Sequence, residues 1–262
     1  MDQIKRGRYL IDYLTKETGR PSNGQVPPIE HIQMQLWRGL VNVRMPQPIS
    51  DEYLNVEDEF LQAELAKKHV TTIGELKPVM NEGIWQDIYL WKGDITTIKA
   101  DAIVNAANTF MTGCYQPNHL CIDNCIHTFA GVRLRKYCAD IIDKQGKNEA
   151  VGQAKITPGF NLPAKHVIHT VGPIVSGELT DLNKSQLKSC YESCLKLAVE
   201  EGLKSIVFCC ISTGVFAFPN EEAAKIAVET VAEFKEERGS DIKVVFNVFG
   251  DKDYEIYKNL LY

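Results

Sequence analysis

The sequence lacks any apolar run as long as the roughly 18–20 residues that cross a bilayer, and it has no block of lysine or arginine. Its first residues, MDQIKRGRYLIDYL, carry charges where a signal peptide would have its apolar core. Sequence-independent nucleic-acid binding needs a basic surface, which this composition does not supply. We therefore expect a cytoplasmic protein that binds neither membranes nor nucleic acid.

Several catalytic signatures are also absent. The chain contains no GxxxxGK[ST], GxGxxG, HExxH or GxSxG pattern. No motif therefore supports a P-loop NTPase, a zincin or an α/β-hydrolase. What is present is ordinary for a folded protein: 262 residues, a net charge of −5, 44% hydrophobic and 24% charged residues. This length allows one large domain, or one domain with a sizeable extension.

The first 75 or so residues show helical patterns and no strand pattern. Apolar spacing predicts helices over 3–18, 29–42 and 56–68, separated by breakers such as PSNGQVPP. Apolar helix faces need a partner surface, and no catalytic constellation occurs here. We interpret residues 1–75 as a helical N-terminal extension packed on a main domain that comprises residues 76–262.

In the main domain, short β-rich runs alternate with helical segments. The expected strands cover 87–91, 101–107, 166–171, 205–211 and 242–249, and the expected helices cover 120–143, 185–201 and 220–237, the last capped by Asn220. Continuous apolar runs are typical of strands covered on both faces. The pattern predicts a three-layer α/β domain with a mostly parallel central sheet, whose ligand lies beyond the carboxyl ends of the strands.

The eight cysteines all lie at or after position 114, and three possible metal ligands fall close together. Cys114, His119 and Cys121 occupy one loop bent by a proline, and these side chains suit Zn²⁺. Three protein ligands leave a fourth position for water or substrate, which is the arrangement of a catalytic zinc site. We predict one Zn²⁺ per chain; Cys125 is the best fourth ligand if the site is closed, and loop thiols without a metal are the alternative.

The other cysteines have the pattern of core residues. A buried thiol behaves as a small hydrophobic group, and adjacent strand residues point to opposite faces and cannot easily share an ion. This interpretation covers Cys138, Cys190, Cys194, Cys209 and Cys210.

The loop over 212–219 reads STGVFAFP and leads into the last of the predicted helices. A turn of small residues before a helix presents backbone N–H groups that suit a phosphate or pyrophosphate. Ser-Thr-Gly is also common turn chemistry, so this signal is weak alone.

Four separated motifs together resemble the macrodomain family. They are GDITTIKADAIVNAAN at 93–108, CIDNCIHTFAG at 121–131, LPAKHVIHTVGP at 162–173 and STGVFAFP at 212–219. The resemblance covers roughly residues 85–262 and implies binding of ADP-ribose. A Cys/His cluster stands where most members have a glycine-rich stretch, which looks like the zinc-containing, sirtuin-linked branch of protein ADP-ribosyl hydrolases. Members of that branch also carry a helical N-terminal extension.

The resemblance implies a set of ligand-binding positions. Asp94 and the Ile95 backbone would contact adenine, and Phe249 would stack on it or belong to the core. The amide of Asn108 would hold the distal ribose, and Asp123 would face that ribose or an attacking water. Residues 212–216 would bind the pyrophosphate, with Phe216 against the distal ribose. The full implied set is Asp94, Ile95, Asn108, Cys121, Ile122, Asp123, Ser212, Thr213, Gly214, Val215, Phe216 and Phe249. Asn108, Asp123 and Phe216 are the implied catalytic residues, and His127, His166 and His169 are interpreted as structural.

Three functions remain open at this point. The first is a zinc-dependent hydrolase that removes mono-ADP-ribose from protein side chains, with linkage to Asp or Glu implied by the resemblance. The others are a non-catalytic ADP-ribose-binding module and a deacetylase of O-acetyl-ADP-ribose. An open metal position favours the enzyme. The resemblance also implies partnership with a sirtuin-type ADP-ribosyltransferase acting on a lipoyl carrier protein.

Overall fold

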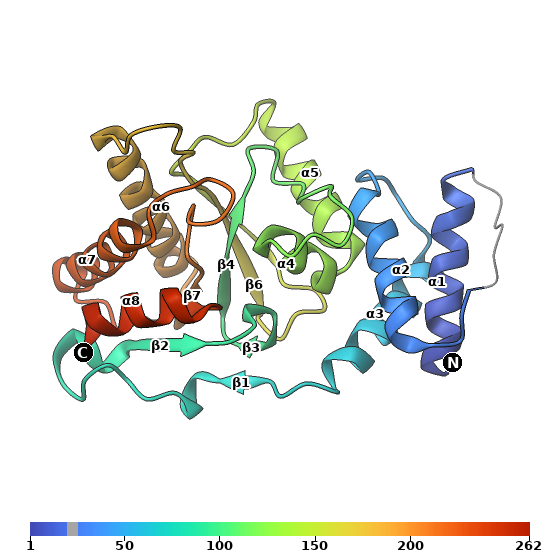
Figure 1. The fold of residues 1–262 in the computed structure, drawn as a ribbon, viewed down its shortest axis with the longest axis horizontal. Helices are drawn as coiled ribbons and strands as arrows, with labels where there is room; N and C mark the ends of the chain where they lie inside the picture. Colours follow the sequence, from blue (N-terminus) through green and yellow to red (C-terminus); the bar gives the residue numbers. More distant parts are fainter. Residues whose placement is uncertain (20–25) are drawn as a thin grey trace.

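A computed structural model describes residues 1–19 and 26–262, and it begins with three helices at one end of the molecule (Figure 1). These are α1 (Gln3–Glu17), α2 (Glu30–Val43) and α3 (Asp51–Leu65). Asp2 and Ser50 begin α1 and α3, because each side chain accepts a hydrogen bond from a backbone N–H of the first turn. The third helix therefore begins at Asp51, before the range that its apolar spacing predicted.

The three N-terminal helices have a small hydrophobic core of their own. Trp37, Tyr53 and Phe60 are almost completely buried there, and the Trp37 indole N–H donates a hydrogen bond to the Tyr53 hydroxyl at 3.1 Å. Phe129 of the following domain packs against this cluster and against the main core. We call the helices α1, α2 and α3 together the helical bundle; the predicted boundary between residues 75 and 76 stays a prediction.

A six-stranded sheet forms the centre of the main domain, with strand order β2-β8-β7-β4-β6-β5. Neighbouring strands are parallel except β5, which runs antiparallel to β6. The strands are β2 (Ile88–Lys92), β4 (Ala102–Ala107), β5 (Ala154–Pro158), β6 (His166–Val171), β7 (Ser205–Phe208) and β8 (Lys243–Val248). A separate parallel pair joins β1 (Thr71–Thr72) to β3 (Ile98–Lys99).

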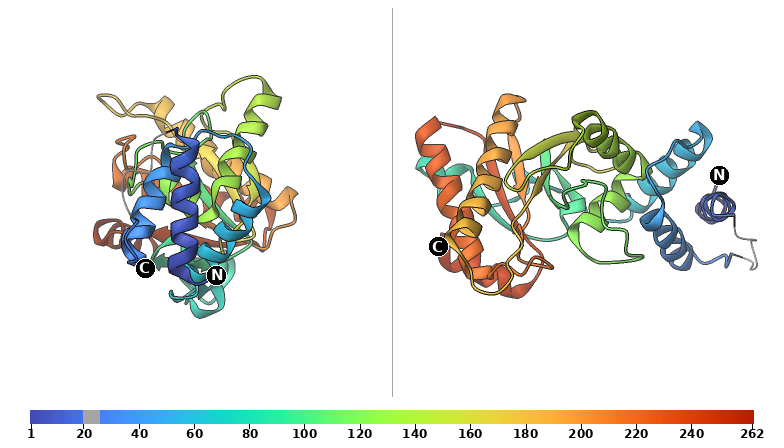
Figure 2. Two further views of the ribbon diagram at one scale, coloured as in Figure 1. Left: turned by 90° about the vertical axis from the view of Figure 1, so that its right-hand side faces the viewer. Right: turned by 90° about the horizontal axis from the view of Figure 1, so that it is seen from above.

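Helices flank the sheet and confirm the predicted three-layer α/β fold (Figures 1 and 2). They are α4 (Ile122–Ala130), α5 (Val132–Gln145), α6 (Asp181–Glu200), α7 (Asn220–Arg238) and α8 (Asp251–Leu261), with short 3-10 turns at Ile73–Glu75, Gly83–Asp87 and Ile95–Thr97. Helices α6, α7 and α8 pack against one another in order, whereas α4 contacts α2 of the helical bundle. In the part of the chain that the structure describes, no helix is long and apolar enough to span a membrane.

Several predicted bounds were wrong in detail. The helix over 120–143 is two helices, because Gly131 has a φ of 92° and the space where its Cβ would stand holds a Glu57 oxygen. Asn220 does not cap α7: Pro219 is the N-cap residue, and the Asn220 amide donates instead to Asp253. The strand over 205–211 ends at Phe208, and the sequence patterns did not predict β5 or α8.

Candidate functional site

Four loops that carry the predicted site residues follow parallel strands of the sheet. The carboxyl ends of β2, β8, β7 and β4 lie along one edge, since these strands are neighbours and run in the same direction. The loops over 93–94, 108–121, 209–219 and 249–250 therefore begin at that edge. This is where ligands bind in open α/β sheets, and the topology gathers there residues that lie far apart in the sequence.

The three predicted metal ligands come together in the loop between β4 and α4. One donor atom each from Cys114, His119 and Cys121 lies within 4.8 Å of the other two. The Cys114 Sγ is 3.5 Å from the His119 Nδ1. Zinc–sulfur and zinc–nitrogen bonds of about 2.3 and 2.0–2.1 Å, at a tetrahedral angle, put the two atoms about 3.6 Å apart. The residue types and the Cys114–His119 spacing thus fit a zinc ion.

Backbone N–H groups point at both sulfurs. The Gln116 N–H donates to the Cys114 Sγ at 3.5 Å, and the Asn124 N–H donates to the Cys121 Sγ at 3.4 Å, at the first turn of α4. Such bonds orient thiolate ligands and favour their charged form. Cys125 lies outside the donor group in the described chain, and its sulfur instead is 3.5 Å from the Arg38 Nη2.

The helical bundle supplies two residues to this loop that sequence reasoning missed. Arg38 donates to the His119 carbonyl at 2.7 Å, and Asn42 accepts a hydrogen bond from the Asn118 backbone N–H at 2.9 Å. The sequence signal for them is their spacing of four on α2, which places both polar groups on one helix face.

Asn108 lies at the end of β4 with its amide held on both sides. The amide oxygen accepts from the Phe110 N–H at 3.0 Å, and the amide nitrogen donates to the Gly113 carbonyl at 2.9 Å. The same nitrogen is 3.4 Å from the Asp123 Oδ2. Asn108 and Asp123 are thus brought together from β4 and α4, and the amide is oriented by local contacts.

Asp123 is buried, and burial raises the pKa of its carboxyl group to about 6. Its Oδ1 accepts a hydrogen bond from the amide of Asn105 at 2.8 Å. Asn105 is a polar residue in an otherwise apolar strand, and sequence reasoning overlooked it. Asp123 therefore lies between two amides. Asn105 is in strand β4, and Asn108 is at the start of the loop that follows it.

A second group of possible donors, His127, Cys138 and His169, lies in the core. The Asn105 amide nitrogen is 3.2 Å from the His169 Nδ1, and the Thr157 hydroxyl is 3.0 Å from the His169 Nε2. Burial lowers the pKa of His169 to about 3, so its ring is neutral. One nitrogen accepts and the other donates, which satisfies His169 without a metal.

The loop after β7 turns sharply before α7. Ser212 and Ala217 have positive φ values of 65° and 55°, and the Phe218 N–H closes the turn on the Ser212 carbonyl at 3.0 Å. The hydrogen bonds of the described chain include none donated by the backbone N–H groups of Gly214, Val215 or Phe216. Unpaired N–H groups in consecutive residues form a concave donor surface that suits a phosphate oxygen.

At the other end of this edge lie Asp94, Ile95 and Phe249. The Asp94 Oδ1 accepts from the backbone and the hydroxyl of Thr96, while its Oδ2 is 3.3 Å from the Lys68 Nζ. Ile95 is buried beneath this turn. Phe249 is 80% exposed, so the alternative that it belongs to the core was wrong. Its ring is accessible to a base.

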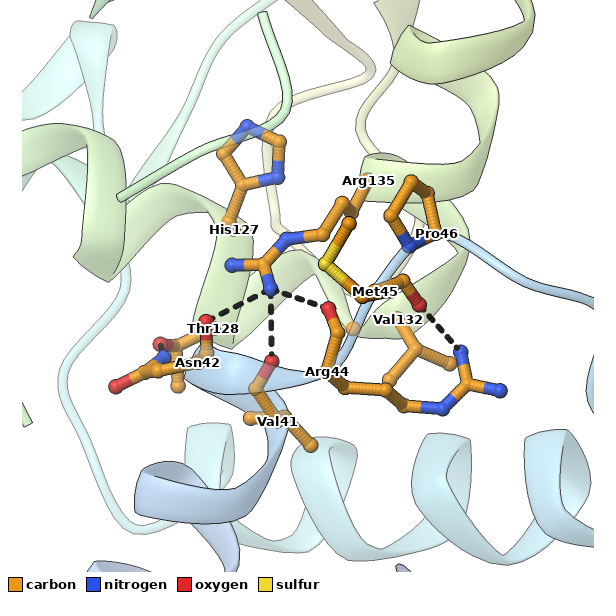
Figure 3. Close-up of a pocket in the computed structure, with 10 residues that line it drawn as sticks. Val41, Asn42, Arg44, Met45, Pro46, His127, Thr128, Val132 and Arg135 are labelled. Carbon is orange, nitrogen blue, oxygen red and sulfur yellow. Dashed lines mark hydrogen bonds between the residues drawn. The ribbon is translucent and has the colours of Figure 1, made fainter. Parts of the chain in front are cut away.

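A water-sized cavity of about 10 Å³ lies where the helical bundle meets the main domain (Figure 3). Arg135 of α5 reaches beside it and donates to the carbonyls of Val41, Asn42 and Arg44 at 3.1, 2.8 and 2.7 Å. These carbonyls end α2, so Arg135 caps that helix from another domain. The cavity is too small for a nucleotide.

The chain is similar to known proteins both in one domain and over its whole length. The family description "Macro domain" matches residues 104–227. A protein-ADP-ribose hydrolase from Treponema medium is 54% identical over 261 residues, covering 100% of both chains. A protein of the same name from Staphylococcus aureus strain MRSA252 is 51% identical over 98% of this chain and 97% of its own.

Solved structures agree with this. A Trypanosoma brucei macrodomain in complex with ADP-ribose superposes with a TM-score of 0.67 at 32% identity, over 86% of this chain and 95% of that one. The Oceanobacillus iheyensis macrodomain with ADP gives a TM-score of 0.62 at 38% identity, over 70% and 94%. Because of its fold, its site at the carboxyl edge of the sheet and this full-length similarity, the chain belongs to the macrodomain family.

Proposed function

We propose that this protein is a zinc-containing hydrolase that removes mono-ADP-ribose from modified protein side chains. Two macrodomain relatives at 51–54% identity over nearly their whole length are named protein-ADP-ribose hydrolases. The observation that carries the proposal is the position of Asn108. It begins the loop that carries all three candidate metal ligands, so a sugar-orienting amide and an ion site are neighbours.

ADP-ribose would extend along the carboxyl edge of the sheet. Asp94 would accept a hydrogen bond from the adenine amino group, the Ile95 N–H would lie beside it, and the exposed ring of Phe249 would stack on the base. The backbone N–H groups of residues 212–216, unpaired at Gly214, Val215 and Phe216, would bind the pyrophosphate. The distal ribose would then reach Asn108 between the β4 and β7 loops.

Cys114, His119 and Cys121 would hold Zn²⁺, with Cys121 and Ile122 at the ribose end of the site. When bound there, the ion would supply Lewis acidity at an open coordination position, polarising an oxygen or lowering the pKa of water. Two observations support the proposed zinc site: the spacing of Cys114 and His119, and the backbone N–H groups that donate to both cysteine sulfurs.

The protein's own groups would fix the sugar and the water. Asn108, held by Gly113 and Asp123, would orient the distal ribose, and Phe216 would press on the sugar and exclude bulk water. Asp123 would help to orient the Asn108 amide. Its carboxylate would also take up the proton that the attacking water loses. Water adds across the bond between ADP-ribose and the side chain, which yields free ADP-ribose and the unmodified side chain.

The linked amino acid is proposed to be Asp or Glu. The modification is proposed to be made by a sirtuin-type ADP-ribosyltransferase that acts on a lipoyl carrier protein. The support for both is the sequence resemblance described above. An ester linkage also matches an ion site, because a metal polarises a carbonyl oxygen.

The test is to incubate the protein with proteins ADP-ribosylated on Asp/Glu, Ser or Arg, with and without a chelator, and to measure released ADP-ribose. Release from the Asp/Glu-linked substrate alone, lost with the chelator and restored by zinc, is expected. Tight ADP-ribose binding with no release would indicate a binding module. Release of acetate from O-acetyl-ADP-ribose with no action on proteins would indicate a deacetylase.

A further inference from the structure

Helix α2 of the helical bundle lies directly behind the loop that carries the candidate metal ligands. A single nitrogen of Arg38, Nη2, donates to the His119 carbonyl at 2.7 Å and to the Asn124 Oδ1 at 2.9 Å. His119 is a candidate ligand, and Asn124 donates its backbone N–H to the sulfur of Cys121. One side chain of α2 therefore connects the backbone of one ligand to the residue that orients another.

Asn42, one turn further along α2, holds the residue before His119. Its Oδ1 accepts from the Asn118 N–H at 2.9 Å, and its amide nitrogen donates to the Thr128 hydroxyl of α4 at 3.0 Å. Asn118 has a φ of 55°, a left-handed conformation that a non-glycine residue adopts at some cost. The bond to Asn42 helps to keep the loop in that conformation.

The third ligand, Cys114, is connected to the same helix through Arg135. One guanidinium nitrogen, Nη1, binds the last carbonyls of α2 (Figure 3), and the other, Nη2, lies 3.4 Å from the Cys114 carbonyl. The Arg135 guanidinium also lies over the Tyr115 ring, 4.3 Å from its centre. Arg135 is buried, so these contacts are shielded from water.

Every candidate ligand is thus held, on its backbone or by a neighbour, through contacts that begin or end at α2. Ligands of a tetrahedral ion must keep fixed separations, and groups behind the ligands tune how well they do so. A loop without such support would have to be ordered by the ion itself, which weakens binding.

We propose that α2 is the structural support of the metal site, and that Arg38 and Asn42 are positioning residues that set its affinity for Zn²⁺. The helical bundle is on this view a functional part of the hydrolase. The inference rests on the proposed zinc site.

The test is the zinc affinity of the full-length protein, measured by competition with a chromophoric chelator, for the wild type, Arg38→Ala and Arg133→Ala. Arg133 is the matched control: it joins the same two parts through an ion pair with Asp58, and no hydrogen bond or ion pair in the described chain joins it to the loop. The thermal midpoint of each metal-free protein reports whether the bundle still packs.

Arg38→Ala is expected to bind zinc about 10- to 100-fold more weakly, the usual effect of removing a group behind a metal ligand. Arg133→Ala should keep wild-type affinity within about twofold, even if its thermal midpoint falls, since it leaves the ligands in place. If Arg38→Ala does not fold, Asn42→Ala carries the same expectation through Asn118.

Equal zinc affinity in Arg38→Ala and the wild type, or an equal loss in Arg133→Ala, would overturn the role of α2 while leaving the zinc site intact. A wild-type protein that binds no zinc would overturn both proposals. The two failures are therefore distinguishable in one set of titrations.

Discussion

The carboxylate of Glu57 accepts a hydrogen bond from the backbone N–H of Val132 at 3.0 Å. Val132 is the first residue of α5, and the preceding Gly131 has no side chain to cap that helix. A residue of α3 therefore caps a helix of the main domain across the interface, where the positive end of the helix dipole favours a negative charge.

Glu57 makes stability depend on pH. Burial raises the pKa of Glu57 from 4.5 to about 7, against the lowering effect of its hydrogen bonds to Val132 and Tyr53. The folded state binds this proton more tightly than the unfolded chain, so the stabilisation is complete below pH 4.5 and is lost as the pH rises through about 7. The full shift corresponds to about 3 kcal/mol.

Urea unfolding at pH 5 and pH 8 measures this, with Glu57→Gln as the comparison. The wild type should lose on the order of 2–3 kcal/mol more than Glu57→Gln between the two pH values, because the amide does not titrate. Other titrating groups contribute equally to both proteins. The same pH dependence in both would contradict the assignment to Glu57.

The second prediction concerns metal content. Elemental analysis of the purified protein should give about one zinc per chain, as one three-ligand site requires. The double variant Cys114→Ala with Cys121→Ala should contain none, whereas Cys125→Ala should keep its zinc because Cys125 lies outside the donor group. Zinc that survives the double substitution would place the metal elsewhere.

The third prediction separates turnover from affinity at Asn108. Asn108→Ala should lower kcat by about 100-fold, the scale on which a small misplacement acts, with a much smaller change in ADP-ribose affinity. Single-turnover kinetics and calorimetry measure the two quantities. An equal loss in both would mean that the amide only binds the ground state.

The fourth prediction concerns recognition of the base by Asp94. Asp94→Ala should weaken ADP-ribose binding by about 1–3 kcal/mol in calorimetry, the range for leaving a buried polar group without its partner. Because Asp94 also holds Thr96, Asp94→Asn is the control: its oxygen keeps the turn, while its N–H groups cannot accept from adenine. Wild-type affinity in Asp94→Asn would leave Asp94 with a structural role only.

The fifth prediction uses the exposure of Phe249. Phe249→Ala should cost about 1–3 kcal/mol of ADP-ribose affinity through lost stacking, with no change in thermal midpoint because the ring is 80% exposed. Phe249→Trp should retain the affinity, since any aromatic face can stack. A fall in thermal midpoint without a change in affinity would contradict the assignment.

The sequence alone determined the features that depend on local pattern. Continuous apolar runs predicted the parallel strands, and apolar spacing predicted the helices on either side, because side-chain burial repeats with the period of each element. The Cys114–Cys121 loop was also local, since its three donors lie within eight residues. The family motifs lie in the loops at the carboxyl edge, where strand direction alone places them.

Only the tertiary structure decided what stands behind those loops. Arg38 meets His119 across 81 residues of sequence, and Glu57 meets Val132 across 75. The spacing of Arg38 and Asn42 marks a polar face of α2 but does not identify its partner. Each contact depends on how the helical bundle docks on α4 and α5. The break at Gly131 depends on the same docking, because a Glu57 oxygen of α3 fills the space where a side chain would stand. The burial of Asp123 between two amides depends instead on how α4 packs against β4 and its loop. Local pattern selects the elements, whereas long-range hydrogen bonds between them exist only once the chain has folded.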